Sequence, residues 1–176
     1  TIERLAAQTG LGVGVFGMVG LNAQVFNWRA GVKTSKACSA AFGGGALERL
    51  NETAAGWLLL STVAPPQRDG MLRRLNAEAP ANRKFNPSDV CARVQESRSQ
   101  GWAVGPAGYG ANAQLAVSLL SLAGDDRPMA LGIAFDAGDT VDTAALGQCL
   151  QEAVLRCLSE NDPAASASIR PLVTAA

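Results

Sequence analysis

The chain has 176 residues, of which 48% are hydrophobic and 17% are charged, a balance typical of one globular domain with a sizeable core. Its 15 lysines and arginines match its 15 aspartates and glutamates, so the formal net charge is zero and we expect no basic surface that grips nucleic acid. Because it has no apolar run of ~18 residues and no secretory pattern at its start, we expect neither a membrane span nor a signal peptide.

The cysteines argue against a metal centre. Cys38, Cys91, Cys149 and Cys157 form no C-x-x-C pair, and the chain has no histidine. A zinc site would therefore need cysteines and carboxylates alone, which is an uncommon ligand set. We expect no metal and no cofactor, and we interpret the cysteines as reduced, mostly buried thiols of a cytoplasmic protein.

The first part of the chain predicts one helix and one hairpin. Residues 1–9 carry a narrow apolar stripe and end at Gly10, which is typical of a helix C-terminus. Residues 12–19 and 23–28 alternate like two strands joined by a tight turn. The glycine-rich stretch 31–45 is expected to be a flexible loop or an irregular edge, and it leads into a short strand at 46–50.

The stretch 51–63 is the centre of the chain's organisation, and it predicts a buried helix. Asn51 and Thr53 are good capping residues, and the apolar residues after them recur on one helical face. We expect Glu52 in the first turn, where the helix dipole favours a negative charge. Residues 54–56 are Ala, Ala and Gly, which leave the first backbone N–H groups unhidden. Two interpretations stay open: a site for an anion or carboxylate, or close packing against a sheet.

The rest of the chain predicts three helices, three strands and a glycine-rich loop at 105–110. Asn86 is expected to cap a helix at 86–100, and Gly101 is expected to end it. The helices are expected at 66–76, 86–100 and 142–159, and the strands at 102–104, 112–122 and 128–135, the last two forming a hairpin. Hairpins at both ends with helices between them predict an α/β domain of the α+β type, in which helices cover a mainly antiparallel sheet of about six strands.

Four stretches in this order resemble the C-terminal effector-binding domain of IclR-family bacterial transcription regulators. They are residues 2–10 (Ile-Glu-Arg-Leu-Ala-Ala-Gln-Thr-Gly), the hairpin 13–28, the Leu50-x-x-Thr53-x-x-Gly56 helix start, and residues 94–104 with their Gly-Trp-Ala step. Each stretch alone is weak, but four at matching spacings are fairly specific. The resemblance spans roughly residues 1–160 and implies a GAF-like fold.

The resemblance also implies how the chain is used. Residues 1–160 would form an effector-binding and oligomerisation domain that assembles as a homodimer or tetramer, and residues 161–176 would be a disordered tail. The winged helix-turn-helix that binds operator DNA in this family is expected to be missing from the sequence, which opens on Thr1. The family's effectors are small metabolites, often carboxylates or aromatic compounds.

The resemblance places the ligand between the sheet and the helix start at 53–56. We therefore expect the binding residues to be Thr53, Ala54, Ala55, Gly56, Tyr109, Asn112, Gln114, Val117, Ile133 and Ala134. Several of the family's polar positions differ here: Arg49 and Asn51 replace Pro and His, and Trp57 replaces a basic residue. This loss of polar anchors predicts an effector with an apolar or aromatic body and one polar end.

Three functions remain after this comparison. The first is a small-molecule sensor that is part of a transcription regulator, and the second is a dimerisation domain of the same family that has lost its ligand. The third, an enzyme, is disfavoured, because the chain has no histidine and no serine or cysteine in a G-x-S-x-G elbow.

Overall fold

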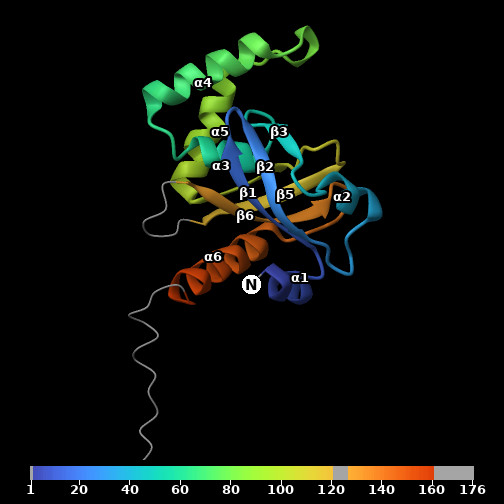
Figure 1. Cartoon of the computed structure of the whole chain (residues 1–176). Helices are drawn as coiled ribbons and strands as arrows, with labels where there is room; N and C mark the ends of the chain where they lie inside the picture. The colour runs from blue at the N-terminus through green and yellow to red at the C-terminus, as the bar shows by residue number, and fades with distance from the viewer. Residues whose placement is uncertain (1, 121–126, 161–176) are drawn as a thin grey trace, which may run out of the picture.

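The structure, a computed structural model, describes residues 2–120 and 127–160, and this part of the chain contains six α-helices, one 3-10 helix and six strands. The strands are β1 (Gly12–Val19), β2 (Asn22–Arg29), β3 (Leu47–Arg49), β4 (Trp102–Pro106), β5 (Ala113–Leu120) and β6 (Met129–Asp136). They form one sheet in the order β3-β2-β1-β6-β5-β4, in which every neighbouring pair is antiparallel. The predicted antiparallel sheet of about six strands is therefore confirmed (Figure 1).

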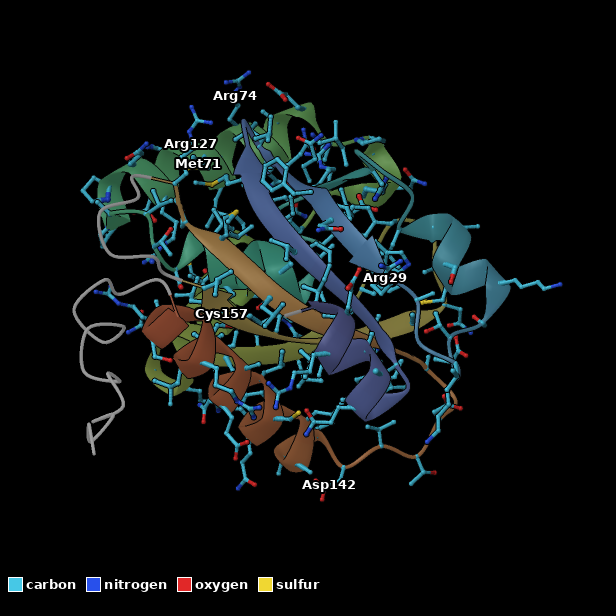
Figure 2. All side chains as sticks on the ribbon, turned by 60° about the horizontal axis from the view of Figure 1, so that its bottom comes forward. Arg29, Met71, Arg74, Arg127, Asp142 and Cys157 are labelled. Carbon is cyan, nitrogen blue, oxygen red and sulfur yellow. The ribbon has the colours of Figure 1, made fainter. Side chains whose placement is uncertain are left out.

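Helices cover the two faces of this sheet unequally. On the outer face lie α1 (Ile2–Thr9) and α6 (Thr143–Glu160), whereas α3 (Ala54–Leu60) lies on the inner face and is flanked by α4 (Pro65–Glu78) and α5 (Pro87–Gln100) (Figure 1). Arg29 of β2, labelled in Figure 2, forms a solvent-exposed ion pair with Glu3 of α1.

Strand alternation separates two apolar cores. On β5, Leu115 and Val117 point toward α3 and join the inner core, while Ala116 between them joins the outer core under α1 and α6. The same alternation on β6 sends Ala134 to the inner core and Ile133 to the outer core. Each fully buried valine, leucine or isoleucine among them contributes about 1.5–3 kcal/mol of hydrophobic stabilisation.

The predicted helix ends near Asn86 and Gly101 are confirmed. The Asn86 side chain accepts a hydrogen bond from the Ser88 N–H at the start of α5, where Pro87 occupies the first helical position. Gly101 ends the same helix with φ +75°, a left-handed conformation that suits glycine. The side chain of Asp142, labelled in Figure 2, caps α6 in the same way.

Three sequence expectations were wrong. Residues 31–45 are not only loop, because they contain α2 (Lys36–Ala41), which Ser35 caps and which ends at the fully buried Phe42. The helix predicted at 51–63 is shorter and begins at Ala54, so Glu52 precedes it rather than lying in its first turn. Of the four cysteines, only Cys38 is buried, and the other three are partly exposed.

Two expectations lie outside the described residues: most of the turn between β5 and β6, and the tail at 161–176. A short 3-10 helix, η1 (Ala81–Arg83), completes the described elements and connects α4 to α5. No helix in the described ranges has both the length and the apolarity needed to cross a bilayer.

Candidate functional site

The start of α3 is buried and closely packed. Thr53 is the N-cap, and its Oγ1 accepts a hydrogen bond from the Gly56 N–H at 2.9 Å. A Cβ on Gly56 would collide with the Leu50 carbonyl, so only glycine lets the helix approach that backbone. This contact accounts for the Leu50-x-x-Thr53-x-x-Gly56 spacing, and it supports close packing as the role of the glycine.

The loop between β4 and β5 covers this helix start. Gly108 lies against Thr53 and Glu48, and both Gly108 and Gly110 have positive φ. Tyr109 between them has φ +57°, which makes it the only described non-glycine residue in the left-handed region. Its backbone N–H donates to Glu48 Oε2 at 2.9 Å, and its hydroxyl donates to the Ala23 carbonyl at 2.8 Å.

Four aromatic side chains, here called the aromatic cluster, fill the space beneath this loop: Phe16, Trp28, Phe42 and Tyr109. Phe42 is central, because it stacks on Trp28 at 4.4 Å between ring centroids and lies 5.3 Å from the Tyr109 ring. The Trp28 Nε1 is buried and has no hydrogen-bond partner.

Glycines make room for the Phe16 ring. A Cβ on Gly14 of β1 would stand 2.9 Å from Phe16 Cζ, and a Cβ on Gly132 of β6 would stand 3.0 Å from Phe16 Cε2. Larger residues at either strand position would therefore push the ring away from the sheet. The small neighbours thus let the aromatic cluster pack directly against the inner face of the sheet.

Two glutamates, Glu48 and Glu52, and one arginine, Arg83, lie beside the aromatic cluster. Arg83 of η1 donates two hydrogen bonds to the Glu52 carboxylate, one from Nε at 3.0 Å, and also lies 3.5 Å from Glu48 Oε1. The second oxygen of Glu48 remains for the Tyr109 N–H. Burial and the nearby Glu48 carboxylate raise the pKa of the Tyr109 phenol well above its ordinary value, so this hydroxyl stays a neutral donor.

Trp57 serves another part of the fold. Its indole N–H donates to the Asn51 carbonyl at 3.0 Å, and its ring lies so close to Gly105 of β4 that a Cβ there would be 2.5 Å away. The Arg93 guanidinium of α5 covers the ring at 4.8 Å from the centroid, a cation–π contact. The tryptophan therefore joins α3, α5 and the sheet edge rather than facing the aromatic cluster.

The structure brings together part of the predicted ligand site. Thr53, Ala54, Ala55 and Gly56 lie on the inner face, and so do Tyr109, Val117 and Ala134.

Three predicted residues lie elsewhere. Ile133 belongs to the outer core, and Gln114 faces the same side because it pairs with Phe135 of that core. Neighbouring residues on a strand point to opposite faces, so both residues lie across the sheet from the start of α3. Asn112 is exposed, just before β5 begins.

Sequence reasoning missed Phe16, Ala23, Phe42 and Glu48. Ser35 before the short apolar stretch was a usable signal for α2, and so for the position of Phe42. No local signal marks Glu48 or the Ala23 carbonyl, because their partner Tyr109 is distant in the sequence.

Solved structures share this fold. No protein-family profile and no curated protein matches the sequence. The effector domain of the transcriptional regulator IclR from Acinetobacter sp. ADP1 is 19% identical, with a TM-score of 0.72 and 92% of each chain covered. At this identity the comparison establishes the fold alone: the described part of the chain has the fold of that effector domain.

Two further matches were solved with aromatic acids. An IclR homolog from Microbacterium hydrocarbonoxydans in complex with 4-hydroxybenzoate is 14% identical, with a TM-score of 0.74, over 95% of this chain and 65% of that one. A double mutant of the PobR inducer-binding domain from Acinetobacter, in complex with 3-hydroxybenzoic acid, is 11% identical, with a TM-score of 0.73 and coverages of 89% and 93%. The present chain thus spans about two thirds of the Microbacterium protein and nearly all of the isolated domain.

Proposed function

We propose that this chain is the ligand-sensing domain of a transcription regulator related to the IclR family. The observation that carries the proposal is the likeness to effector and inducer-binding domains over about 90% of the chain. The neighbours are transcription regulators rather than enzymes, so the proposed role is regulatory binding. Contact with operator DNA would belong to a domain outside this chain, because the chain has zero formal net charge.

We place the effector on the inner face, under the loop that carries Tyr109. Phe16, Phe42 and Val117 supply apolar walls, while the Ala23 carbonyl and the Glu48 carboxylate supply polar ends. Such a surface suits a small organic molecule with an aromatic or apolar body. Entry requires the loop to move, because Tyr109 closes the site in this conformation. The effector lies beside the start of α3 in this proposal, but its recognition rests on the aromatic cluster rather than on that short helix.

A thermal-shift panel tests the proposal. Aromatic acids, neutral aromatics, aromatic amines and hydrophilic acids such as glyoxylate are compared on the wild type and on Ala55→Leu, with the exposed Ala92→Leu as the matched control. A ligand at about 100 times its dissociation constant adds ~2.7 kcal/mol to the free energy of unfolding. Aromatic compounds should raise the melting temperature of the wild type and of Ala92→Leu, and the rise should shrink in Ala55→Leu. A response to hydrophilic acids alone would contradict the proposed wall.

The aromatic cluster favours one alternative, a domain of the same fold that has lost its ligand. In that case Phe16, Phe42 and Tyr109 occupy the former effector space permanently. The two functions differ in the panel, since a domain without a ligand would melt at the same temperature with every compound.

We further propose that the chain assembles as a homodimer or tetramer through two-fold interfaces. The sequence resemblance supports this assembly, and the exposed Phe26, Val19 and Leu47 offer apolar surface for it. Light scattering at micromolar concentration should give a multiple of the 18.1 kDa chain mass, and a clean monomer would contradict the proposal.

A further inference from the structure

Tyr109 occupies the proposed effector site as a ligand would. Its ring lies 5.3 Å from Phe42 and 6.2 Å from Phe16, measured between ring centroids. It offers two donors, a phenolic hydroxyl to the Ala23 carbonyl and a backbone N–H to the Glu48 carboxylate. Both acceptors belong to the neighbouring strands β2 and β3, which are far from the loop in sequence. The loop therefore inserts a phenol and a nitrogen donor into a site that other parts of the chain form.

The geometry points to a phenolic amine as the effector, which takes the place of Tyr109. This inference rests on the proposed ligand-sensing function. In Tyr109, two carbon atoms, Cα and Cβ, separate the donating nitrogen from the 4-hydroxyphenyl ring. Tyramine contains the same ring, the same two carbons and a nitrogen at the same place. A free molecule of this kind can therefore present its hydroxyl to Ala23 and its nitrogen to Glu48.

The charges at the nitrogen end favour an ammonium group. Glu48 and Glu52 carry two negative charges there, against one positive charge on Arg83, and Arg83 is bound chiefly to Glu52. The backbone N–H of Tyr109 is an uncharged donor, whereas an ammonium group would bring a positive charge to the hydrogen bond with the Glu48 carboxylate and so strengthen it. An aromatic acid of similar size would instead bring a carboxylate against the Glu48 carboxylate, where two like charges repel.

The loop is able to give way to such a ligand. Gly108 and Gly110 on either side of Tyr109 both have positive φ, and Gly110 has open space where a side chain would lie. Glycines change backbone conformation with little steric resistance. The left-handed φ of Tyr109 itself is unfavourable for a bulky residue, so its departure from the site also relieves backbone strain.

Removing the internal competitor is the main test. Tyr109→Gly suits φ +57° and vacates the ring position, whereas the matched control Tyr109→Phe keeps the ring. Calorimetric titration compares tyramine with 4-hydroxybenzoate on both variants and on the wild type. We expect Tyr109→Gly to bind tyramine at least tenfold more tightly than the wild type or Tyr109→Phe. In the latter two proteins an aromatic ring occupies the site, and only the fraction of molecules with an open site can bind tyramine. We also expect Tyr109→Gly to favour tyramine over 4-hydroxybenzoate.

A second variant tests the charge. Glu48→Gln combined with Tyr109→Gly should weaken tyramine at least tenfold and leave the affinity for p-cresol, which has no amine, unchanged. Glu96→Gln on the exposed side of α5 serves as the charge-matched control and should alter neither affinity. Equal losses for tyramine and p-cresol would show that Glu48 acts only through the structure, and would overturn the assignment of the amine.

The outcomes separate this inference from the proposed function. A Tyr109→Gly variant that prefers 4-hydroxybenzoate refutes the phenolic amine and leaves a ligand-sensing domain intact. If another compound of the panel stabilises the wild type while tyramine binds no variant, the inference also fails alone. If no compound binds any variant, both fail. If Tyr109→Gly does not fold, the wild type decides the question: millimolar tyramine must raise its melting temperature and must not raise that of Glu48→Gln.

Discussion

Gly108 lies directly against Thr53, so that a Cβ on the glycine would stand 2.5 Å from the threonine Cγ2. Gly110, two residues later, has nearly the same backbone conformation, φ +73° against +79°, but nothing within 4 Å of the Cβ position. An alanine at either glycine would have an unfavourable left-handed backbone, but only an alanine at Gly108 would also collide with a neighbour.

We therefore expect Gly108→Ala to destabilise the domain more than Gly110→Ala does. Gly110→Ala should cost about 1–2 kcal/mol, the penalty of a left-handed alanine. Gly108→Ala adds overpacking against Thr53 and Glu48, which typically costs about 1–3 kcal/mol more. Urea unfolding of both variants measures the difference. Equal losses would mean that the loop does not press on the start of α3.

Tyr109 should make stability fall at high pH. The pKa of its phenol in the folded protein is raised above the ordinary value of 10.0. The neutral phenol's contribution to the free energy of unfolding is therefore complete below about pH 10 and is lost as the pH rises toward the folded pKa. Cys38, whose pKa is raised to about 11 by burial and by Asp136, acts in the same direction. Tyr109→Phe removes only the first effect, so its urea midpoint should fall less steeply above pH 10 than that of the wild type.

The chain offers a direct control for that titration, because Tyr109 is its only tyrosine. Tyrosinate absorbance therefore reports this one phenol. In the folded protein it should appear only at a pH well above 10, and urea should restore the ordinary value. A folded-state titration at the ordinary pH would show that the loop is open in solution.

Phe42 should be among the most costly aromatic side chains to remove. It is 0% exposed and contacts the rings of Phe16, Trp28 and Tyr109. Phe42→Ala should reduce the free energy of unfolding by about 3–5 kcal/mol, the usual range for a buried phenylalanine. Phe85, which is only partly buried, is the matched control, and Phe85→Ala should cost clearly less. Denaturant unfolding measures both, and equal costs would refute a packed cluster.

The chain alone should not bind duplex DNA specifically. Its formal net charge is zero, whereas specific binding normally uses several lysine and arginine contacts to phosphates. Fluorescence anisotropy at about 150 mM salt should show no tight, sequence-dependent binding. Tight discrimination between operator sequences by this chain would contradict the assignment of DNA binding to another domain.

Locally encoded elements could be predicted from the sequence. Asn86 with Pro87 and Gly101 fix the ends of α5 through capping chemistry that involves only neighbouring residues. The six residues of α2 were missed because part of their support is tertiary: Phe42 packs in the aromatic cluster, and the Ser35 hydroxyl donates to Asp136 Oδ1 at 3.1 Å, 101 residues away. A helix this short is unstable in isolation, so sequence patterns carry little information about it.

The site was harder to predict than the elements that form it. Which of Ile133 and Ala134 faces α3 depends on strand register, and a shift of one residue exchanges the two faces. Glu48 acquires its place in the site only because β3 pairs with β2 and brings its carboxylate beneath Tyr109. Such contacts arise from the assembled sheet and leave no pattern along the chain.

The strand order has a kinetic consequence. The β1–β2 and β5–β6 hairpins join neighbouring segments and can form within microseconds. The central pair is different, since Gly12 of β1 lies opposite Ala134 of β6, from the other end of the chain. Closing so long a loop costs chain entropy before any contact compensates for it. We therefore expect the meeting of β1 and β6 to set the rate of folding. A destabilising change confined to either hairpin turn weakens contacts that form before this step, so it should slow folding more than it accelerates unfolding.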